Sequence, residues 1–353
     1  MKYINRDNYH ISLRPIRGYG KPFNFIYSCR EAGKSTALAL ELIIAAYENN
    51  KVAILLRRQI ADITESYIDS IGVTINKFLS KEDKIKFTYK KGSVKEGVVK
   101  CFINDKFALA IVGCSNPVGR IKSLNFGAIH SISFDEYIIN PEFKEKYLPN
   151  EANKIKEIYN TFQREGERVP FFFFGNPYSL YNPVFLWWGV DVSKLKIGSF
   201  YVGSNFVIQC YDITQELKDH ILKNNPLYEF DDSYKKYGFE GKAINDSNIK
   251  LMNRPKSYSL RFVFKMAENY IEVYQSNYDV YQDDLYYCEI VKDSDYNRSS
   301  ICFDFADMVD NSMMLASSEK SFFNRFKIAM RRGNVAFKDI NAYYLIKEIY
   351  YNL

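Results

Sequence analysis

A phosphate-binding loop is the clearest chemical motif in this sequence. Residues 28–35 read Ser-Cys-Arg-Glu-Ala-Gly-Lys-Ser, between the apolar run 23–27 and an apolar, helix-forming run at 37–47. A loop of this kind between a buried strand and a helix holds a nucleoside triphosphate, because backbone amides and the helix N-terminus face the phosphates. We expect Lys34 to reach the β and γ phosphates and the Ser35 hydroxyl to take a magnesium site.

The loop departs from the common pattern at its first position. Ser28 stands where that pattern has glycine, so the chain is expected to turn there without the access of glycine to positive φ. Arg30, Gly33 and Thr36 complete the residues expected beside the nucleotide. For this motif alone, the alternative is a chance Gly-Lys-Ser sequence at the start of a helix.

Two adjacent acids, Asp135 and Glu136, end a second apolar run that begins at Ala128. We expect Asp135 to hold Mg²⁺, through the Ser35 hydroxyl or a water, and Glu136 to orient and deprotonate the water that attacks the γ phosphate. Neighbouring side chains on a strand point to opposite faces, so both acids can serve one site only if the backbone turns where the strand ends. Solvated acids at the end of a core strand are the alternative.

A glutamate directly after the metal-binding aspartate separates the chain from GTPases and small-molecule kinases. The sequence also contains no Asn-Lys-x-Asp run that would read guanine. The two motifs therefore predict ATP and Mg²⁺ as the ligands.

Composition sets the outer limits of the interpretation. The chain has 353 residues and is 47% hydrophobic, enough for two domains with sizeable cores. Lys and Arg total 48 against 42 Asp and Glu, and the net charge of +6 permits nucleic-acid contact without demonstrating it. The six scattered cysteines fit a reducing cytoplasm, and the three distant histidines argue against a histidine-based site. Without a long apolar run, we expect a protein that is neither exported nor membrane-spanning.

Strands and helices alternate over the first half of the chain. Strand patterns occupy 51–56, 98–102, 107–112 and 169–174, and helical patterns occupy 60–79 and 150–162. This alternation predicts an α/β fold with a mostly parallel sheet. A helical pattern then spans 214–237, and 257–287 alternates like antiparallel strands. We expect a nucleotide-binding domain at 1–197, a helical linker region at 198–255 and a smaller α+β domain at 256–353.

The sequence resembles the DNA-packaging ATPases of phi29-like phages, relatives of the terminase large subunits. The resemblance covers most of the chain, and Arg30 is similar to the arginine of the packaging-motor loop, whereas Ser28 departs from the family's glycine. It is densest at Phe134-Asp135-Glu136-Tyr137-Ile138 and Tyr147-Leu148-Pro149-Asn150-Glu151, and continues through Glu167-Arg168-Val169, Gly175-Asn176 and Asn182-Pro183-Val184-Phe185. It implies a P-loop ATPase domain of the additional-strand, catalytic-glutamate (ASCE) type, in a motor that translocates double-stranded viral DNA into an empty procapsid.

The resemblance also implies further catalytic groups. Arg164 corresponds to an arginine finger that acts in a neighbouring subunit if one residue is inserted beside Gln163, with Arg168 as the alternative. Lys122 corresponds to a second basic residue acting across the interface, and Asn176 to a sensor of the γ phosphate or the lytic water. Ordinary surface charge is the alternative for the basic residues, and a simple Gly-Asn-Pro turn for Asn176.

Other basic residues are candidates for contact with ligands or nucleic acid. Arg57 and Arg58 end a strand, on the side of an open α/β sheet where ligands bind, and would suit nucleotide or neighbour contact. Every charged residue from Lys320 to Lys338 is basic, and an apolar stripe there would leave the basic face of a helix to a polyanion. The nucleic-acid candidates are Lys144, Lys146, Arg325, Lys327, Arg331 and Arg332, with a solvated basic surface as the alternative.

In terminases the matching C-terminal domain is an RNase H-like nuclease, which needs a carboxylate on its first strand. The corresponding run, 258–264, has none. The resemblance therefore implies a degenerate, nucleic-acid-binding domain, while Asp283, Asp284 and Asp304 leave metal-dependent cleavage open.

The resemblance implies several partners: double-stranded DNA, the capsid portal, a structural packaging RNA and identical subunits in a ring, pentameric by resemblance. It places the protein in the host cytoplasm and at the procapsid portal vertex, and not in the mature virion. Two other functions compete with packaging: a ring-shaped translocase or helicase not tied to a capsid, and a non-catalytic portal subunit.

Overall fold

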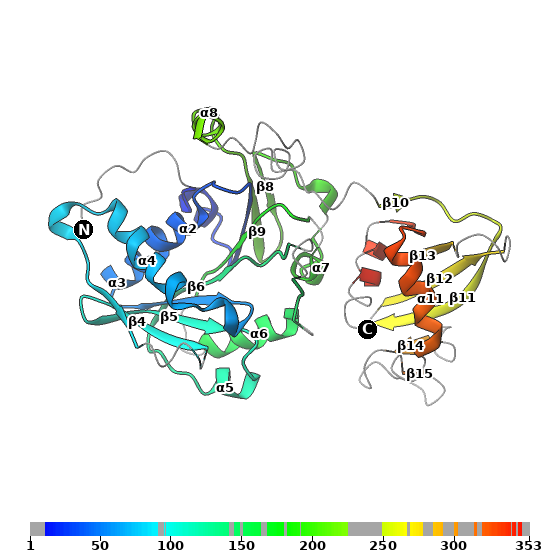
Figure 1. Ribbon diagram of the computed structural model, residues 1–353, viewed down its shortest axis with the longest axis horizontal. Coiled ribbons are helices and arrows are strands. Elements are labelled where there is room, and N and C mark those ends of the chain that lie inside the picture. The colour runs from blue at the N-terminus through cyan, green and yellow to red at the C-terminus, as the bar shows by residue number, and fades with distance from the viewer. Residues whose placement is uncertain are drawn as a thin grey trace. The chain divides into compact units, whose positions relative to one another are not determined.

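The computed structural model describes two compact units of the chain (Figure 1). The units comprise Met1–Leu180 with Trp187–Ile244, and Tyr181–Leu186 with Asn245–Leu353. The described residues are 11–90, 95, 97–140, 145–148, 151–163, 168–179, 182–190, 192–224, 249–266, 269–277, 285–291, 300–302, 314–315, 320–339, 341–343 and 345–347. Within them, no helix has both the length and the apolar character needed to cross a membrane.

A nine-stranded sheet forms the core of the first unit, in the order β3-β4-β5-β2-β6-β7-β1-β9-β8. Six neighbouring strands in this order, β5-β2-β6-β7-β1-β9, run parallel. β3, β4 and β8 are antiparallel additions at the two edges. The mostly parallel α/β fold expected from the sequence is thus confirmed. The strands are β1 (Phe23–Ser28), β2 (Val52–Arg57), β3 (Phe87–Tyr89), β4 (Val98–Ile103), β5 (Lys106–Gly113), β6 (Ile129–Asp135), β7 (Phe171–Gly175), β8 (Ser199–Val202) and β9 (Phe206–Tyr211).

Helices lie on both faces of this sheet. Figure 1 shows α4 on one side of β4 and β5, with α5 and α6 on the other. The helix after the phosphate loop is continuous but changes its winding, from α2 through a π-helical segment to α3. The bounds are α1 (Arg14–Arg17), α2 (Lys34–Ala37), the π-helical segment (Leu38–Ile44), α3 (Ala45–Glu48), α4 (Glu65–Phe78), α5 (Val118–Lys122), α6 (Glu151–Phe162), α7 (Pro183–Trp187) and α8 (Gln215–Asn224), with 3₁₀ turns at Ile60–Asp62, Lys81–Asp83 and Val192–Lys194.

The connectivity of the sheet brings the two chemical motifs together. β7 lies between β1, which leads into the phosphate loop, and β6, which ends at Asp135. Because the carboxyl ends of parallel strands meet at one edge, the loop, the acids and the residue after β7 all lie at that edge.

Residues 199–211 differ from the helical linker expected at 198–255. β8 and β9 are strands of the nine-stranded sheet, and β9 pairs with β1 along the whole length of β1. β9 is buried along most of its length, and a short apolar run of this kind cannot be told from a buried helix by periodicity alone. α8 starts where a helix was expected at 214–237, and the part of that pattern from residue 225 to 237 lies outside the described residues.

A seven-stranded mixed sheet forms the second unit, in the order β10-β16-β13-β12-β11-β14-β15. β11, β12 and β13 are mutually antiparallel, as the alternation at 257–287 predicted, and β14, β15, β16 and β10 are parallel additions. Phe326 and Ala329 of α11 pack on the apolar face of this sheet. The bounds are β10 (Lys250–Leu251), β11 (Tyr258–Met266), β12 (Asn269–Ser276), β13 (Tyr286–Val291), β14 (Ser300–Cys302), β15 (Met314–Leu315), α11 (Lys320–Arg331) and β16 (Val335–Phe337).

A partly buried histidine at the amino end of β6 predicts sensitivity to acid. Burial, with Arg17 and Lys51 nearby, lowers the pKa of His130 from 6.5 to about 4. Between those two pH values the unfolded chain binds more protons than the folded one, so stability falls as the pH falls, by roughly 1–2 kcal/mol in total because solvent screens the partly exposed ring.

His130→Gln is therefore expected to flatten the loss of stability below about pH 6.5. Urea unfolding at a series of pH values measures this, with His220→Gln, at an exposed position of α8, as the control. An equally steep loss in His130→Gln would contradict the assignment.

Candidate functional site

The phosphate loop turns at two positions after β1. Glu31 has φ 62° and Gly33 has φ 77°, both in the left-handed region. Ser28 instead stays within β1, paired with Tyr211 and fully buried. The turn expected at Ser28 is thus made later in the loop, which removes the need for glycine at that position.

Lys34 is held against the loop by three acceptors. Its Nζ donates to the Ser28 carbonyl oxygen at 3.2 Å, to Ser28 Oγ at 3.0 Å and to the Cys29 carbonyl oxygen at 2.7 Å. Burial lowers the pKa of Lys34 to about 8, although nearby Cys29, Asp135 and Glu136 raise it. The ammonium group therefore lies at the loop and within electrostatic reach of the acids. Arg30 and Ser35 are exposed beside it, and Thr36 is half-buried.

The backbone turns sharply between the two acids. Glu136 follows the last residue of β6 and has φ 58°, in the left-handed region that non-glycine residues rarely adopt. As a result both carboxylates reach one guanidinium: Arg57 Nη1 lies 3.2 Å from Asp135 Oδ2, and Nη2 lies 2.8 Å from Glu136 Oε2. This confirms the turn that a shared site requires. The Asp135 side chain is 14% exposed and that of Glu136 is 57% exposed, so Glu136 is open to water.

A tyrosine of α4 completes the environment of the acids. The Tyr67 hydroxyl donates to Asp135 Oδ2 at 3.3 Å, and its ring lies 4.6 Å from the Arg57 guanidinium. Burial raises the pKa of Asp135, while the Arg57 guanidinium lowers it. Arg57 is thus at the ligand edge as predicted, with contacts to the acids of its own chain. Tyr67 was missed because a tyrosine within an amphipathic helix carries no sequence signal for this role.

Arg58 has a different position from the one expected. It is 7% exposed, and it forms a bidentate pair with Glu151, Nε to Oε2 at 2.8 Å and Nη2 to Oε1 at 3.1 Å. The same guanidinium donates to the carbonyl oxygens of Glu136 at 3.0 Å and Tyr137 at 2.8 Å. The expectation of nucleotide or neighbour contact is therefore wrong for Arg58. It fixes the backbone that carries the acids.

Asn176 follows β7 at the same edge. The pairings of Tyr27 with Gly175 and of Asp135 with Phe174 place it between the phosphate loop and the acids. Asn176 is 8% exposed, and its side-chain Oδ1 has no hydrogen-bond partner among the described residues. A buried amide oxygen without a partner is costly, so this position suits a ligand that can donate to it.

The glycine before Asn176 leaves room for the residue after the acids. A Cβ on Gly175 would lie 2.5 Å from Tyr137 Cε1 and 2.9 Å from Ile138 Cδ1. Gly175→Ala is therefore expected to displace Tyr137 and, with it, Glu136, lowering ATP turnover by about 10²-fold while nucleotide affinity changes little. Steady-state turnover and nucleotide titration measure the two effects.

Gly119→Ala is the control for that substitution, because a Cβ at Gly119 meets nothing within 4 Å. Equal turnover in the two alanine variants would contradict the role given to Gly175.

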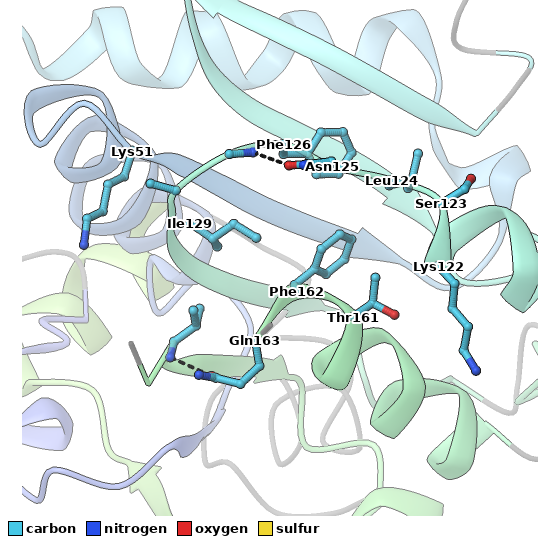
Figure 2. A pocket seen from close by; sticks show the side chains of 13 residues that line it. Lys51, Lys122, Ser123, Leu124, Asn125, Phe126, Ile129, Thr161, Phe162 and Gln163 are labelled. Atoms are coloured by element: carbon cyan, nitrogen blue, oxygen red, sulfur yellow. Dashed lines mark hydrogen bonds between the residues drawn. The ribbon is translucent and has the colours of Figure 1, made fainter. Parts of the chain in front are cut away.

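Lys122 lies away from this edge. It ends α5 and pairs with Glu157 of α6, Nζ to Oε2 at 2.6 Å. It also lines a pocket of about 560 Å³ at the amino ends of β2 and β6. Figure 2 shows Lys51 and Lys122 on opposite sides of this pocket, with Phe162 between them. Since amino and carboxyl ends are opposite edges of a parallel sheet, Lys122 lies across the sheet from the loop of its own chain.

The remaining predicted residues are spread over the chain. Arg164 and Lys144 lie outside the described residues, as does the side chain of Arg331. Arg168, Lys146, Arg325 and Arg332 are exposed, and Lys327 is partly buried. The helix expected from Lys320 ends at Arg331, and β16 follows.

Two oxygen donors at the site suit magnesium. Mg²⁺ takes oxygen ligands, keeps several waters and is held largely by one or two carboxylates and the substrate phosphates. The exposed Ser35 hydroxyl and the Asp135 carboxylate match that donor set. Within the described residues, no group of three or more His, Cys, Asp or Glu side chains could hold a metal ion.

Known proteins match the chain over nearly its whole length. The family model "Podovirus DNA encapsidation protein (Gp16)" matches residues 10–353. The DNA packaging protein of Bacillus phage B103 is 23% identical over 329 residues, 90% of this chain and 93% of that protein. The DNA packaging protein of Bacillus phage phi29 is 22% identical over 348 residues, 95% of this chain and 94% of that protein.

Two solved structures share the fold. The Phi-28 gp11 DNA packaging motor has a TM-score of 0.70 and 15% identity, with 98% of each chain covered. The bacteriophage Phi-29 viral genome packaging motor assembly has a TM-score of 0.64 and 20% identity, with 98% of this chain and 99% of that chain covered.

Proposed function

The chain belongs to the podovirus DNA encapsidation protein (Gp16) family and is a DNA-packaging ATPase, and we propose that it uses ATP and Mg²⁺ at the carboxyl edge of the nine-stranded sheet to translocate double-stranded viral DNA into an empty procapsid. The left-handed turn at Glu136 carries this proposal, because it brings both acids to one point beside the phosphate loop. The position of β7 between β1 and β6 supports an ASCE-type ATPase domain.

Each group at the edge has a role in this proposal. Lys34 would turn from the loop carbonyls to the β and γ phosphates, and Ser35 with Asp135 would hold Mg²⁺, which would supply positive charge to neutralise the phosphates. Glu136 is the general base for the attacking water. Arg57 occupies its Oε2, which leaves Oε1 for the proton. The unpartnered Oδ1 of Asn176 supports contact with the lytic water.

We propose that residues 256–353 form a degenerate RNase H-like domain. The order β13-β12-β11-β14-β15, with two antiparallel pairings followed by two parallel ones, supports this fold. β11 carries no carboxylate to hold metal, so we infer that it lacks nuclease activity. Arg325 and Arg332, exposed on and after α11, would contact DNA or a packaging RNA.

We further propose a homo-oligomeric ring, pentameric by resemblance, at the procapsid portal in the host cytoplasm. Lys122 lies across the sheet from its own phosphate loop, which supports action on the ATP of a neighbour. Arg164, with Arg168 as the alternative, would supply the arginine finger. A ring-shaped translocase or helicase without a capsid is the competing function.

ATP turnover tests the proposal when it is measured with the chain alone, with duplex DNA, and with DNA plus empty capsids. Turnover that rises with capsids and makes DNA nuclease-resistant supports packaging. Turnover driven by DNA alone, with no protection of DNA, favours the competing function. Lys34→Ala is expected to abolish turnover, and Lys223→Ala, exposed on α8, is the matched control.

A further inference from the structure

Two oppositely charged surfaces lie on opposite faces of the β4–β5 part of the sheet. One, the acidic stripe, consists of Glu65, Asp69 and Val73 on α4; the other, the basic face, consists of Lys51, Lys100 and Lys122. We propose that the acidic stripe of one copy of this chain docks on the basic face of a second copy. The inference rests on the proposed ring and identifies one of its contact surfaces.

The acidic stripe is set by the packing of α4. Ile68, Ile71 and Ile75 are buried in the core of the first unit. The residues at positions 65, 69 and 73 are spaced by four, so they form a single row on the helix, and all three are exposed, Val73 by 69%. The row thus presents two carboxylates and then an unusually exposed apolar side chain, before the exposed Lys77 in the last turn of the helix.

The basic face follows from the alternating directions of the side chains along β4. Val99 and Cys101 belong to the same core as the isoleucines of α4, so Lys100 between them points to the other face of the sheet. Its Nζ lies 5.4 Å from the centre of the Phe107 ring and 5.7 Å from that of Phe126. Phe126 also lines the pocket between Lys51 and Lys122, which makes the basic face continuous.

The placement of the two surfaces suits a ring. A head-to-tail ring joins two different surfaces of each subunit, and they must be complementary. Here the complementarity is electrostatic, because the acidic stripe has two carboxylates and the basic face has three ammonium groups. One of these ammonium groups, that of Lys122, also pairs with Glu157 of its own chain. The basic face also contains the packed rings of Phe107, Phe126 and Phe162 and a concave pocket. These features favour a protein side chain over a DNA backbone as the occupant, since Phe side chains are typical of protein interfaces.

The contact would also bring Lys122 of one copy close to the ATP edge of its neighbour. α4 carries Tyr67, whose hydroxyl bonds Asp135, so the acidic stripe borders the ATP edge. A neighbour seated on the stripe therefore brings its Lys122 to that edge from outside the subunit. The same contact explains how a residue on the far side of the sheet could reach a γ phosphate.

Charge reversal in the full-length chain tests the docking. One variant carries Glu65→Lys and Asp69→Lys, and a second carries Lys51→Glu and Lys100→Glu. Each is expected to weaken self-association at least tenfold, because like charges then face each other. The variant with all four changes should associate within about threefold of the unaltered chain, because each of its contacts again joins opposite charges. Sedimentation velocity over a concentration series measures association, and thermal unfolding verifies folding.

Two control variants outside the acidic stripe and the basic face have the same changes in charge. They are Glu216→Lys with Asp219→Lys, and Lys223→Glu with Lys194→Glu, which also alters the exposed Lys194 before β8. Association of both reversed variants at the level of these controls would overturn the proposal, as would failure of the variant with all four changes to recover. Loss of duplex DNA affinity in Lys51→Glu/Lys100→Glu with unchanged self-association would assign the basic face to DNA instead. A failure of the proposed function would be seen in a different measurement. In that case the Lys34→Ala variant would hydrolyse ATP as fast as the unaltered chain.

Discussion

Glu136→Gln is expected to lower the rate of ATP hydrolysis by about 10²- to 10⁴-fold while nucleotide affinity stays close to that of the unaltered chain. Glutamine cannot take the proton of the attacking water, yet it keeps the size and the hydrogen-bonding capacity of the side chain. The effect should be confined to the chemical step, because the side chain is 57% exposed and touches its own chain through Arg57 Nη2. Single-turnover hydrolysis and titration with a fluorescent nucleotide measure the two quantities.

Glu216→Gln is the control for this substitution. Glu216 is an exposed glutamate on α8, so the same change of charge occurs away from the acids. Unchanged hydrolysis in Glu136→Gln would remove Glu136 from the role of general base. A large loss of nucleotide affinity would instead indicate that Glu136 binds the nucleotide in the ground state.

Arg58→Met is expected to have the largest effect on stability, a loss of about 3–5 kcal/mol in the free energy of unfolding. The substitution leaves the carboxylate of Glu151, 2% exposed, without its bidentate partner. It also removes the donors to the carbonyl oxygens of Glu136 and Tyr137, so turnover should fall with stability. Urea unfolding followed by circular dichroism measures the loss.

A double variant separates these two consequences. Arg58→Met/Glu151→Gln removes the unpaired buried charge and keeps an acceptor for the Leu148 amide, so most of the lost stability should return. Turnover should stay low, because the two carbonyl oxygens still lack their donors. Lys86→Met is the control: the Lys86–Asp105 pair has side chains 64% and 75% exposed, and its loss should cost less than about 1 kcal/mol. Equal losses in the Arg58 and Lys86 variants would contradict the importance of the buried pair.

The two motifs were predictable from sequence because each lies within a few consecutive residues. An apolar strand, a Gly-Lys-Ser loop and a helix-forming run identify a phosphate site locally, and two acids after an apolar strand identify a partner strand. Parallel strands place their carboxyl ends at one edge, so the meeting of Lys34 with Asp135 and Glu136 followed from the α/β pattern. The antiparallel strands at 257–287 followed in the same way from alternation.

Tertiary structure alone decided which side chains surround those motifs. Arg57 and Arg58 are adjacent in sequence, yet one binds both acids and the other is buried against Glu151, because neighbouring residues of a strand point to opposite faces. β9 could not be separated from a helix by periodicity, since a strand buried on both faces shows no alternation.

Local sequence was therefore sufficient to locate the residues of the proposed site, a phosphate loop and two adjacent acids after an apolar strand, because each motif consists of residues close together in the chain. The left-handed turn at Glu136, the contact of Tyr67 with Asp135 and the placement of the acidic stripe and the basic face on opposite faces of the sheet came from the tertiary structure. These features depend on contacts between segments far apart in sequence, about which local periodicity carries no information.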